Sequence, residues 1–351
     1  MSGATTDSQL TVVVATSNRP AVLRRQLRYL SDVEFRFRVV IADSSSPEFA
    51  RENRTAVATT TGLKLHYGYS EAGHLQVCRN VLKRLITPYA AVFSDGDFAF
   101  PTTLEMAIDF LEAHPGFGSA VGITVSDLAR KGRCYVLPAR SIKNDSPVVR
   151  FRTLARDWFS TVPGVHRTKL AYETYRNASE CSDFLNGRQF SEVILSQMAA
   201  LQSRIHLIPR IACLQEDREP ALAPRLATAE DSQHREHFQR FHQNLVDQLE
   251  AAGATLDHAE LMIEQLYGHL RAVSASIVAR KPPGMLGKIQ RETIRHYGHL
   301  VNLIRSDRIL QRRTLRSSDL IGLKTEWKQA RHLIARYPDG MSDDQRTPIA
   351  A

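Results

Sequence analysis

The feature that most constrains the fold is the run LTVVVAT at residues 10–16, which is almost entirely apolar and rich in β-branched side chains. Such a run predicts a strand buried on both faces, as in a parallel sheet covered by helices. The turn SNRP follows, in which Ser17 or Asn18 can cap a helix and Pro20 suits its first turn. The apolar residues of AVLRRQLRYL then recur at helical spacing, so a helix is expected after this strand.

The same alternation continues along the first half of the chain. Further strands are predicted at 37–42, 63–69 and 89–94, and helices at 74–86 and 101–115. Beyond them we expect strands and loops at 119–150, helices at 155–162 and 190–201, and a bent strand or strand pair at 204–214. This order predicts an α/β fold with a mainly parallel sheet flanked by helices.

A Pro-rich joint at 219–226 marks a change in pattern, because the chain then reads as helical to about residue 337. We therefore expect an α/β domain at 1–220 and a helical C-terminal region at 221–351. Residues 280–336 contain 14 Lys and Arg against four Asp and Glu, whereas the whole chain has a formal net charge of +9. The basicity thus belongs to the helical region.

Three interpretations of this basic region stay open. Its helices could pack on the α/β domain with a solvated basic outer face, make peripheral contact with anionic lipid, or bind an anionic glycan or nucleic acid. Nucleic acid is the least favoured, because no zinc-finger, RRM or homeodomain signature is present. The helical region could also mediate a homo-oligomer.

The N-terminal residues, the apolar stretches and the cysteines together indicate where in the cell the protein is located. The first residues, MSGATTDSQ, show neither the cationic nor the apolar part of a signal peptide, and no apolar stretch approaches the length of a spanning helix. The four cysteines are dispersed and form no CxxC pair, which argues against a zinc site or a disulfide framework. We expect a cytoplasmic protein, at the inner face of the membrane if the basic region contacts lipid.

Polar clusters follow three of the predicted strands: Thr16 to Arg19, Asp43 to Ser45, and Asp95 to Asp97. Ligands of open α/β sheets bind at the carboxyl ends of the strands, so these clusters are candidates for a site. Two carboxylates on one turn can share Mg²⁺ or Mn²⁺, which prefer oxygen ligands. The alternative is that Ser-Asp-Gly only forms the turn that ends the strand.

Four stretches in order, VVVATSNRPAVLRRQL, VVIADSSS, GHLQVCRNVLKRL and FSDGDFAFP, resemble the GT-A glycosyltransferases, especially those of family 2. The resemblance runs from residue 10 to about 214, and FLEAHPGFGSAVG resembles a bacterial subgroup. It implies that FSDGDFAFP contains the metal-binding D-x-D motif of that family. The residue before the motif is Ser94 rather than a third acid, so a metal-independent variant stays open.

The resemblance also implies roles for individual residues. Asp95 would face the ribose and the metal, and Asp97 would bind the metal, Mg²⁺ or Mn²⁺. Contacts to the nucleotide, its base and its diphosphate or ribose would come from Thr16, Asn18, Arg19, Asp43 and Arg79. The alternatives are a helix cap for Asn18, an Asx-turn for Asp43 and a solvated helix face for Arg79.

Inverting sugar transfer needs a general base to take the proton of the acceptor hydroxyl. Glu192 in FSEVIL is the first candidate, because it is expected near the start of a helix, where the helix dipole favours a carboxylate. Asp183 is the second candidate. An ordinary surface glutamate remains the alternative for Glu192.

The resemblance therefore implies transfer of a sugar from a nucleotide diphosphate-sugar to a hydroxyl of a saccharide, glycan or lipid-linked acceptor, with inversion and with a metal. A nucleotidyltransferase is one alternative, although TSNRPAVL lacks the Gly-rich loop that such enzymes carry after the first strand. The other alternative is a catalytically inactive nucleotide-sugar-binding module that acts in assembly through its helical region.

Overall fold

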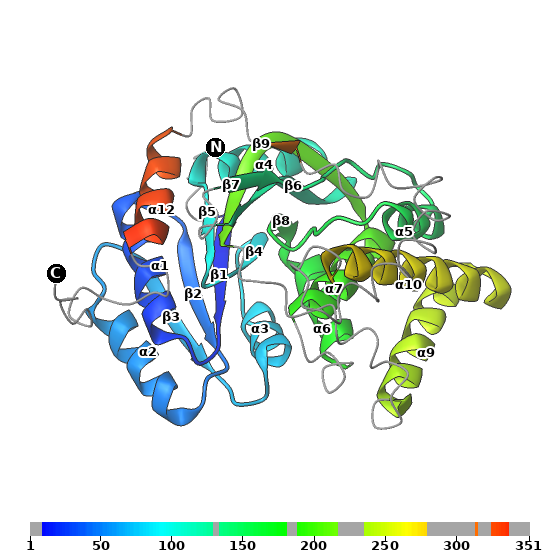
Figure 1. Cartoon of the computed structure of the whole chain (residues 1–351), viewed down its shortest axis with the longest axis horizontal. Coiled ribbons are helices and arrows are strands. Elements are labelled where there is room, and N and C mark those ends of the chain that lie inside the picture. Colours follow the sequence, from blue (N-terminus) through cyan, green and yellow to red (C-terminus); the bar gives the residue numbers. More distant parts are fainter. Residues whose placement is uncertain are drawn as a thin grey trace, which may run out of the picture.

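The computed structural model describes residues 9–128, 133–180, 188–216, 235–278, 313–314 and 324–336. Within them one sheet is flanked by helices on both faces (Figure 1). Its strands are β1 (Leu10–Thr16), β2 (Arg38–Asp43), β3 (Lys64–Tyr69), β4 (Tyr89–Ser94), β5 (Asp97–Ala99), β6 (Phe117–Leu128), β7 (Arg133–Val136), β8 (Gly164–Arg167), β9 (Arg204–Glu216) and β10 (Arg313–Thr314).

The strands lie in the order β10-β7-β6-β8-β4-β1-β2-β3, and β9 pairs with both β5 and β6. The strands β3, β2, β1 and β4 are parallel neighbours, and β6 and β9 are also parallel. Five pairings are antiparallel: β10 with β7, β7 with β6, β6 with β8, β8 with β4, and β5 with β9. The parallel strands therefore place the carboxyl ends of β1, β2 and β4 at one edge, where the predicted polar clusters begin.

The helices are α1 (Pro20–Asp32), α2 (Pro47–Thr59), α3 (His74–Leu82), α4 (Pro101–Ala113), α5 (Pro147–Arg156), α6 (Thr168–Ser179), α7 (Arg188–Gln202), α9 (Arg235–Ala251), α10 (Leu256–Val278) and α12 (Lys324–Arg336). Four of them begin at proline. Proline suits the first helical position because its φ is already helical and an amide donor there would have no partner within the helix.

Most predicted elements are confirmed, although α6 and β8 were not predicted, and three further differences have local causes. Helix α2 was not predicted, because its weakly apolar sequence PEFARENRTAVAT buries only Ala50, Asn53 and Ala56. The helix expected at 155–162 is instead α5, which ends at Arg156. The prediction of a Ser17 or Asn18 cap is wrong: the cap residue of α1 is Arg19, without a side-chain capping bond.

Two apolar clusters fill the faces of the sheet. One packs β1, β2 and β4 against α1 and α4, and includes Ala330, Leu333 and Ile334 of α12. The other packs the opposite face against α3, α6 and α7, and includes residues of α9 and α10. Helices from the predicted C-terminal region thus pack on both faces of the α/β domain, and α12 lies beside α1 (Figure 1). The predicted boundary at residue 220 lies outside the described residues, so the division into two domains stays a prediction.

No helix in the described part of the chain is long and apolar enough to cross a membrane. Most of the basic segment at 280–336 lies outside the described residues, including the arginines of 305–312. The three interpretations of this segment therefore remain predictions.

Candidate functional site

The carboxyl ends of β1 and β4 lie side by side, because the two strands are parallel neighbours with Ala15 opposite Ser94. This register brings Thr16 to Asp95, and the Thr16 hydroxyl donates a hydrogen bond of 2.7 Å to Asp95 Oδ2. Both side chains are buried, with 2% and 0% of their surface exposed. Two clusters that are 79 residues apart in sequence thus form one contact.

Arg19 completes the surroundings of Asp95 from the start of α1. Its Nη2 forms an ion pair with Asp95 Oδ1 and donates a 3.3 Å bond to Ser94 Oγ. The Arg19 side chain keeps 32% of its surface exposed, whereas that of Asp95 is fully buried. A charge-assisted bond of this kind orients the carboxylate and leaves the guanidinium partly open to a ligand.

Asp97 begins β5 and turns back toward the loop that precedes it. Its Oδ2 accepts a 2.9 Å bond from the Ser94 amide, and its Oδ1 accepts a 3.3 Å bond from Gln215 Nε2. Its carbonyl accepts a 2.8 Å bond from Gln26 Nε2. The pairing of β5 with β9, and the side chain of Gln26 on α1, therefore hold the Asp97 end of the D-x-D turn in place.

A buried ion pair lies directly behind this turn. Arg25 Nη2 and Nη1 lie 2.6 and 3.4 Å from the two carboxylate oxygens of Glu216, and the side chains are 1% and 6% exposed. The Glu216 amide donates a 3.3 Å bond to the carbonyl of Gly96. Because a bidentate pair fixes the position of its carboxylate, Arg25 and Glu216 form a brace behind the turn.

Asp43, at the end of β2, is fully buried and well partnered. Its Oδ1 accepts a 2.8 Å bond from the Ser45 amide, and its Oδ2 accepts bonds of 2.9 Å from Asn53 and 2.6 Å from the Tyr67 hydroxyl. Burial, and then the hydrogen bond to Asp43, raise the pKa of Tyr67. A carboxylate has about four acceptor positions, so Asp43 retains capacity for a further donor.

Asn18 joins the first two strand-end clusters. Its amide donates a 2.7 Å bond to Ser45 Oγ, and its Oδ1 accepts a 2.8 Å bond from the Ser46 amide. Its φ of 54° lies in the left-handed region, which asparagine tolerates better than most residues. These two bonds and this φ shape the turn after β1. The residue is exposed, so Asn18 also remains accessible to a ligand.

Two other predicted site residues have less defined surroundings. Arg79 is half-buried on α3, where its Nη1 donates a 3.4 Å bond to Gln76 of the same helix. Glu192 is half-buried on α7, but it lies beyond the first turn of that helix, which contains no acidic residue. Glu192 thus lies further along its helix than expected, where the helix dipole acts on it less. Asp183 lies outside the described residues.

His166, on β8, does not face a ligand. Its Nδ1 lies 2.8 Å from Ser119 Oγ and its Nε2 lies 3.1 Å from the carbonyl of Thr161, with 8% of the residue exposed. Burial lowers its pKa to about 4. The imidazole is therefore a neutral, internally bonded group at neutral pH.

The sequence interpretation missed most of the brace behind the D-x-D turn. Arg25, Gln26 and Gln215 were given no role, and Glu216 was not distinguished from a loop residue. One signal was available: Gln26 shares the apolar side of α1 with Leu23 and Leu30, and a polar side chain there needs a buried hydrogen-bond partner. The partner of Arg25 could not be found in this way, because Glu216 is 191 residues away.

The chemistry of the donor set fits a divalent cation only in part. Asp95 and Asp97 supply hard oxygen ligands, and the position of a Cβ at Gly96 would meet only Glu216 Oε2, at 3.9 Å, among the described residues. Among the described residues, the space beside Gly96 is thus bounded only by Glu216. The described residues contain no group of three or more metal-binding side chains, so a cation would need further ligands from substrate and water.

No protein-family profile and no curated protein matches the sequence. Among solved structures, S. aureus TarS 1–349 is similar with a TM-score of 0.51 at 15% identity, over 97% of this chain and 94% of that one. The same protein in complex with UDP-GlcNAc gives a TM-score of 0.52 at the same identity and coverage. This similarity establishes the fold, and the chain has the GT-A architecture that its sequence resemblance implied.

Proposed function

We propose that the protein is a glycosyltransferase that takes a sugar from a nucleotide diphosphate donor. The observation that carries the proposal is the contact of Thr16, Arg19 and Asp95 beside Asp97, at the carboxyl ends of β1 and β4. Ligands of open α/β sheets bind at this edge. The TarS structure with UDP-GlcNAc makes that nucleotide-sugar the first donor to test.

In this proposal different residues of the chain contact different parts of the donor. Arg19, which is partly exposed, contacts the diphosphate, and Asn18 and Arg79 lie along the nucleotide. Asp43 accepts from the base through its remaining acceptor position, and Thr16 keeps the Asp95 carboxylate toward the ribose. Asp95 and Asp97 would hold Mg²⁺ or Mn²⁺, which neutralises charge on the departing diphosphate.

The transfer would invert the anomeric centre. The acceptor oxygen forms a bond to the anomeric carbon as the bond from that carbon to the diphosphate oxygen breaks, and the acceptor proton passes to a carboxylate. Glu192 is the first candidate for this base and Asp183 the second. The acceptor would be a saccharide, a glycan or a lipid-linked sugar. In this proposal the enzyme is cytoplasmic, acts in polysaccharide biosynthesis and contacts the membrane peripherally.

The test is a screen of nucleotide diphosphate-sugars, beginning with UDP-GlcNAc, for release of the nucleotide diphosphate with EDTA, Mg²⁺ or Mn²⁺. Asp97→Ala and Glu192→Gln are compared with Asp109→Asn, a change of an exposed acid on α4. We expect turnover that requires a metal and that both site variants lose. Turnover that survives both substitutions would overturn the assignment of the site.

The same screen separates the alternatives. Thermal stabilisation by a nucleotide-sugar without any turnover would instead support an inactive binding module, because a ligand that binds only the native state stabilises it by mass action. Release of pyrophosphate from a nucleoside triphosphate and a sugar phosphate would support a nucleotidyltransferase.

A further inference from the structure

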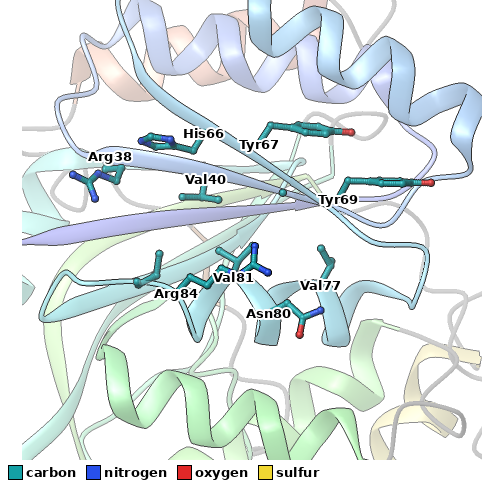
Figure 2. Close-up of a pocket in the computed structure, with 11 residues that line it drawn as sticks. Arg38, Val40, His66, Tyr67, Tyr69, Val77, Asn80, Val81 and Arg84 are labelled. Carbon is teal, nitrogen blue, oxygen red and sulfur yellow. The ribbon is translucent and has the colours of Figure 1, made fainter.

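A pocket of about 400 Å³ lies between α3 and the strands β2 and β3, at the edge of the sheet that β3 forms (Figure 2). The strands β2 and β3 form one wall, and α3 with the residues that follow it forms the other. The volume lies within the range of small-molecule sites. The described residues that line it come from β2, β3, α3 and the two residues Arg84 and Leu85 that follow α3.

The floor of the pocket is apolar. Val77 and Val81 of α3 and Val40 of β2 are buried, at 2%, 8% and 9% exposed, and Leu85 lies just beyond the helix. The helix can approach the strand closely because residue 68 is glycine: a Cβ there would lie 3.1 Å from Val81 Cγ2. The pocket therefore offers an apolar surface to a ligand as well as space.

One end of the pocket is basic. Arg38 begins β2, whereas Arg84 follows α3, and both line the pocket because the helix returns the chain toward the amino ends of the parallel strands. His66 joins them, since its register partner is Val40 on the same face. Among the described residues no Asp or Glu lines the pocket, and none of these three side chains has a hydrogen bond or ion pair with another described residue.

This basic end is separate from the D-x-D site. Asp95 and Asp97 lie at the carboxyl edge of the parallel strands, and Arg38 lies at the amino edge. The other end of the pocket is formed by Tyr69 and Val77 (Figure 2), and the Tyr69 hydroxyl donates a 2.8 Å bond to Glu71. A ligand held by the two arginines would therefore lie at the amino edge, whereas Tyr69, the register partner of Asp43, closes the pocket toward the carboxyl edge.

We propose that this pocket binds a molecule in which a phosphate monoester is attached to an apolar group. The two guanidinium groups match the geometry of phosphate oxygens, and the valine floor would cover the apolar part. Two sources share this chemistry: a soluble aryl or alkyl phosphate, and the headgroup region of an anionic lipid. The site is additional to the proposed transferase activity and does not depend on it.

The experiment is calorimetric titration of the full chain with phenyl phosphate, and separately with inorganic phosphate and with phenol. Arg38→Gln/Arg84→Gln removes the basic end, and Arg51→Gln/Lys83→Gln removes the same charge from exposed positions outside the pocket. A second series uses sedimentation with phosphatidylcholine vesicles, with and without phosphatidic acid.

We expect phenyl phosphate to bind about tenfold more tightly than either fragment, with a loss of about tenfold in the pocket variant and less than about twofold in the control. A matching loss of binding to phosphatidic acid vesicles would identify a lipid as the source. Failure of phenyl phosphate to saturate the protein, or equal losses in both double variants, would overturn the proposal. Circular dichroism of both variants checks that they fold.

Discussion

The two ends of the parallel strands carry charges of opposite sign in opposite surroundings. At the carboxyl end, Asp43, Asp95 and Asp97 are at most 3% exposed and each accepts at least two hydrogen bonds from the protein. At the amino end, Arg84 is exposed and Arg38 half-buried, and neither side chain is bonded to another described residue. The cost of removing a charge should therefore differ sharply between the two ends.

The largest effect is expected for Asp97→Ala, measured as kcat/KM for transfer from the donor. In the proposed mechanism Asp97 would hold the cation that neutralises charge on the departing diphosphate, so its loss should reduce kcat/KM by about 10³-fold. Asp109→Asn, an exposed change on α4, serves as the control and should stay within about twofold of the native value. Retention of most activity by Asp97→Ala would remove the carboxyl end from the proposed site.

Arg25→Met should be the most destabilising substitution at the carboxyl end. It leaves Glu216 buried without its bidentate partner, which should lower the free energy of unfolding by about 3 kcal/mol in urea denaturation. The adjacent Arg24→Met is a matched control, because Arg24 pairs with Glu52 at 3.5 Å on the surface, with side chains 34% and 47% exposed. We expect its effect to stay below about 0.5 kcal/mol.

The double variant Arg25→Met/Glu216→Met shows whether the stability lost in Arg25→Met comes from the unpaired Glu216 charge or from lost packing. Removal of both partners leaves neither charge of the pair buried alone, so we expect it to recover most of the stability lost in Arg25→Met. It should still reduce transfer, because the D-x-D turn has lost its brace. A double variant with the same stability as Arg25→Met would show that the ion pair is not the cause.

His166 lies close to the amino end of β4, opposite Ala90, and is buried. It therefore tests whether the cost of a charge to stability depends on burial or on which end of the strands carries it. Its pKa falls from 6.5 to about 4 in the folded protein, so the unfolded chain binds more protons between these values. Stability is then fully present above pH 6.5 and is lost as the pH falls toward 4, by about 3 kcal/mol. His166→Gln should reduce this loss in urea denaturation measured across that range, and an unchanged pH profile would contradict the burial of a neutral imidazole.

The smallest effect is expected at the amino end itself. Arg38→Gln/Arg84→Gln removes two charges that have no partner among the described residues, so its free energy of unfolding should stay within about 0.5 kcal/mol of the native value. Thermal denaturation at low and moderate ionic strength measures this, and a small gain at low salt is expected from reduced repulsion. A marked loss of stability would show that these arginines support the fold rather than a ligand.

Much of the fold was predictable because its elements have strong local signals. The run at 10–16 and the prolines that begin α1 and α4 mark their elements without reference to the rest of the chain. Helix α2 was missed for the opposite reason, since it buries one narrow side of small residues and its pattern is weak. The antiparallel pairings of β8 with β4 and β6 were also not predicted, because pairing partners are set by packing between distant segments.

The sequence by itself determined the α/β order of the first half and the positions of the polar clusters after β1, β2 and β4, because both follow from the local alternation of apolar and polar residues. Only the tertiary structure decided which of these side chains meet. It brought Thr16 to Asp95 through the register of two parallel strands and placed Glu216 against Arg25. It also brought Arg84 back to Arg38 around one pocket. These contacts join segments far apart in the chain, and strand register and helix packing, rather than local pattern, fix such distances.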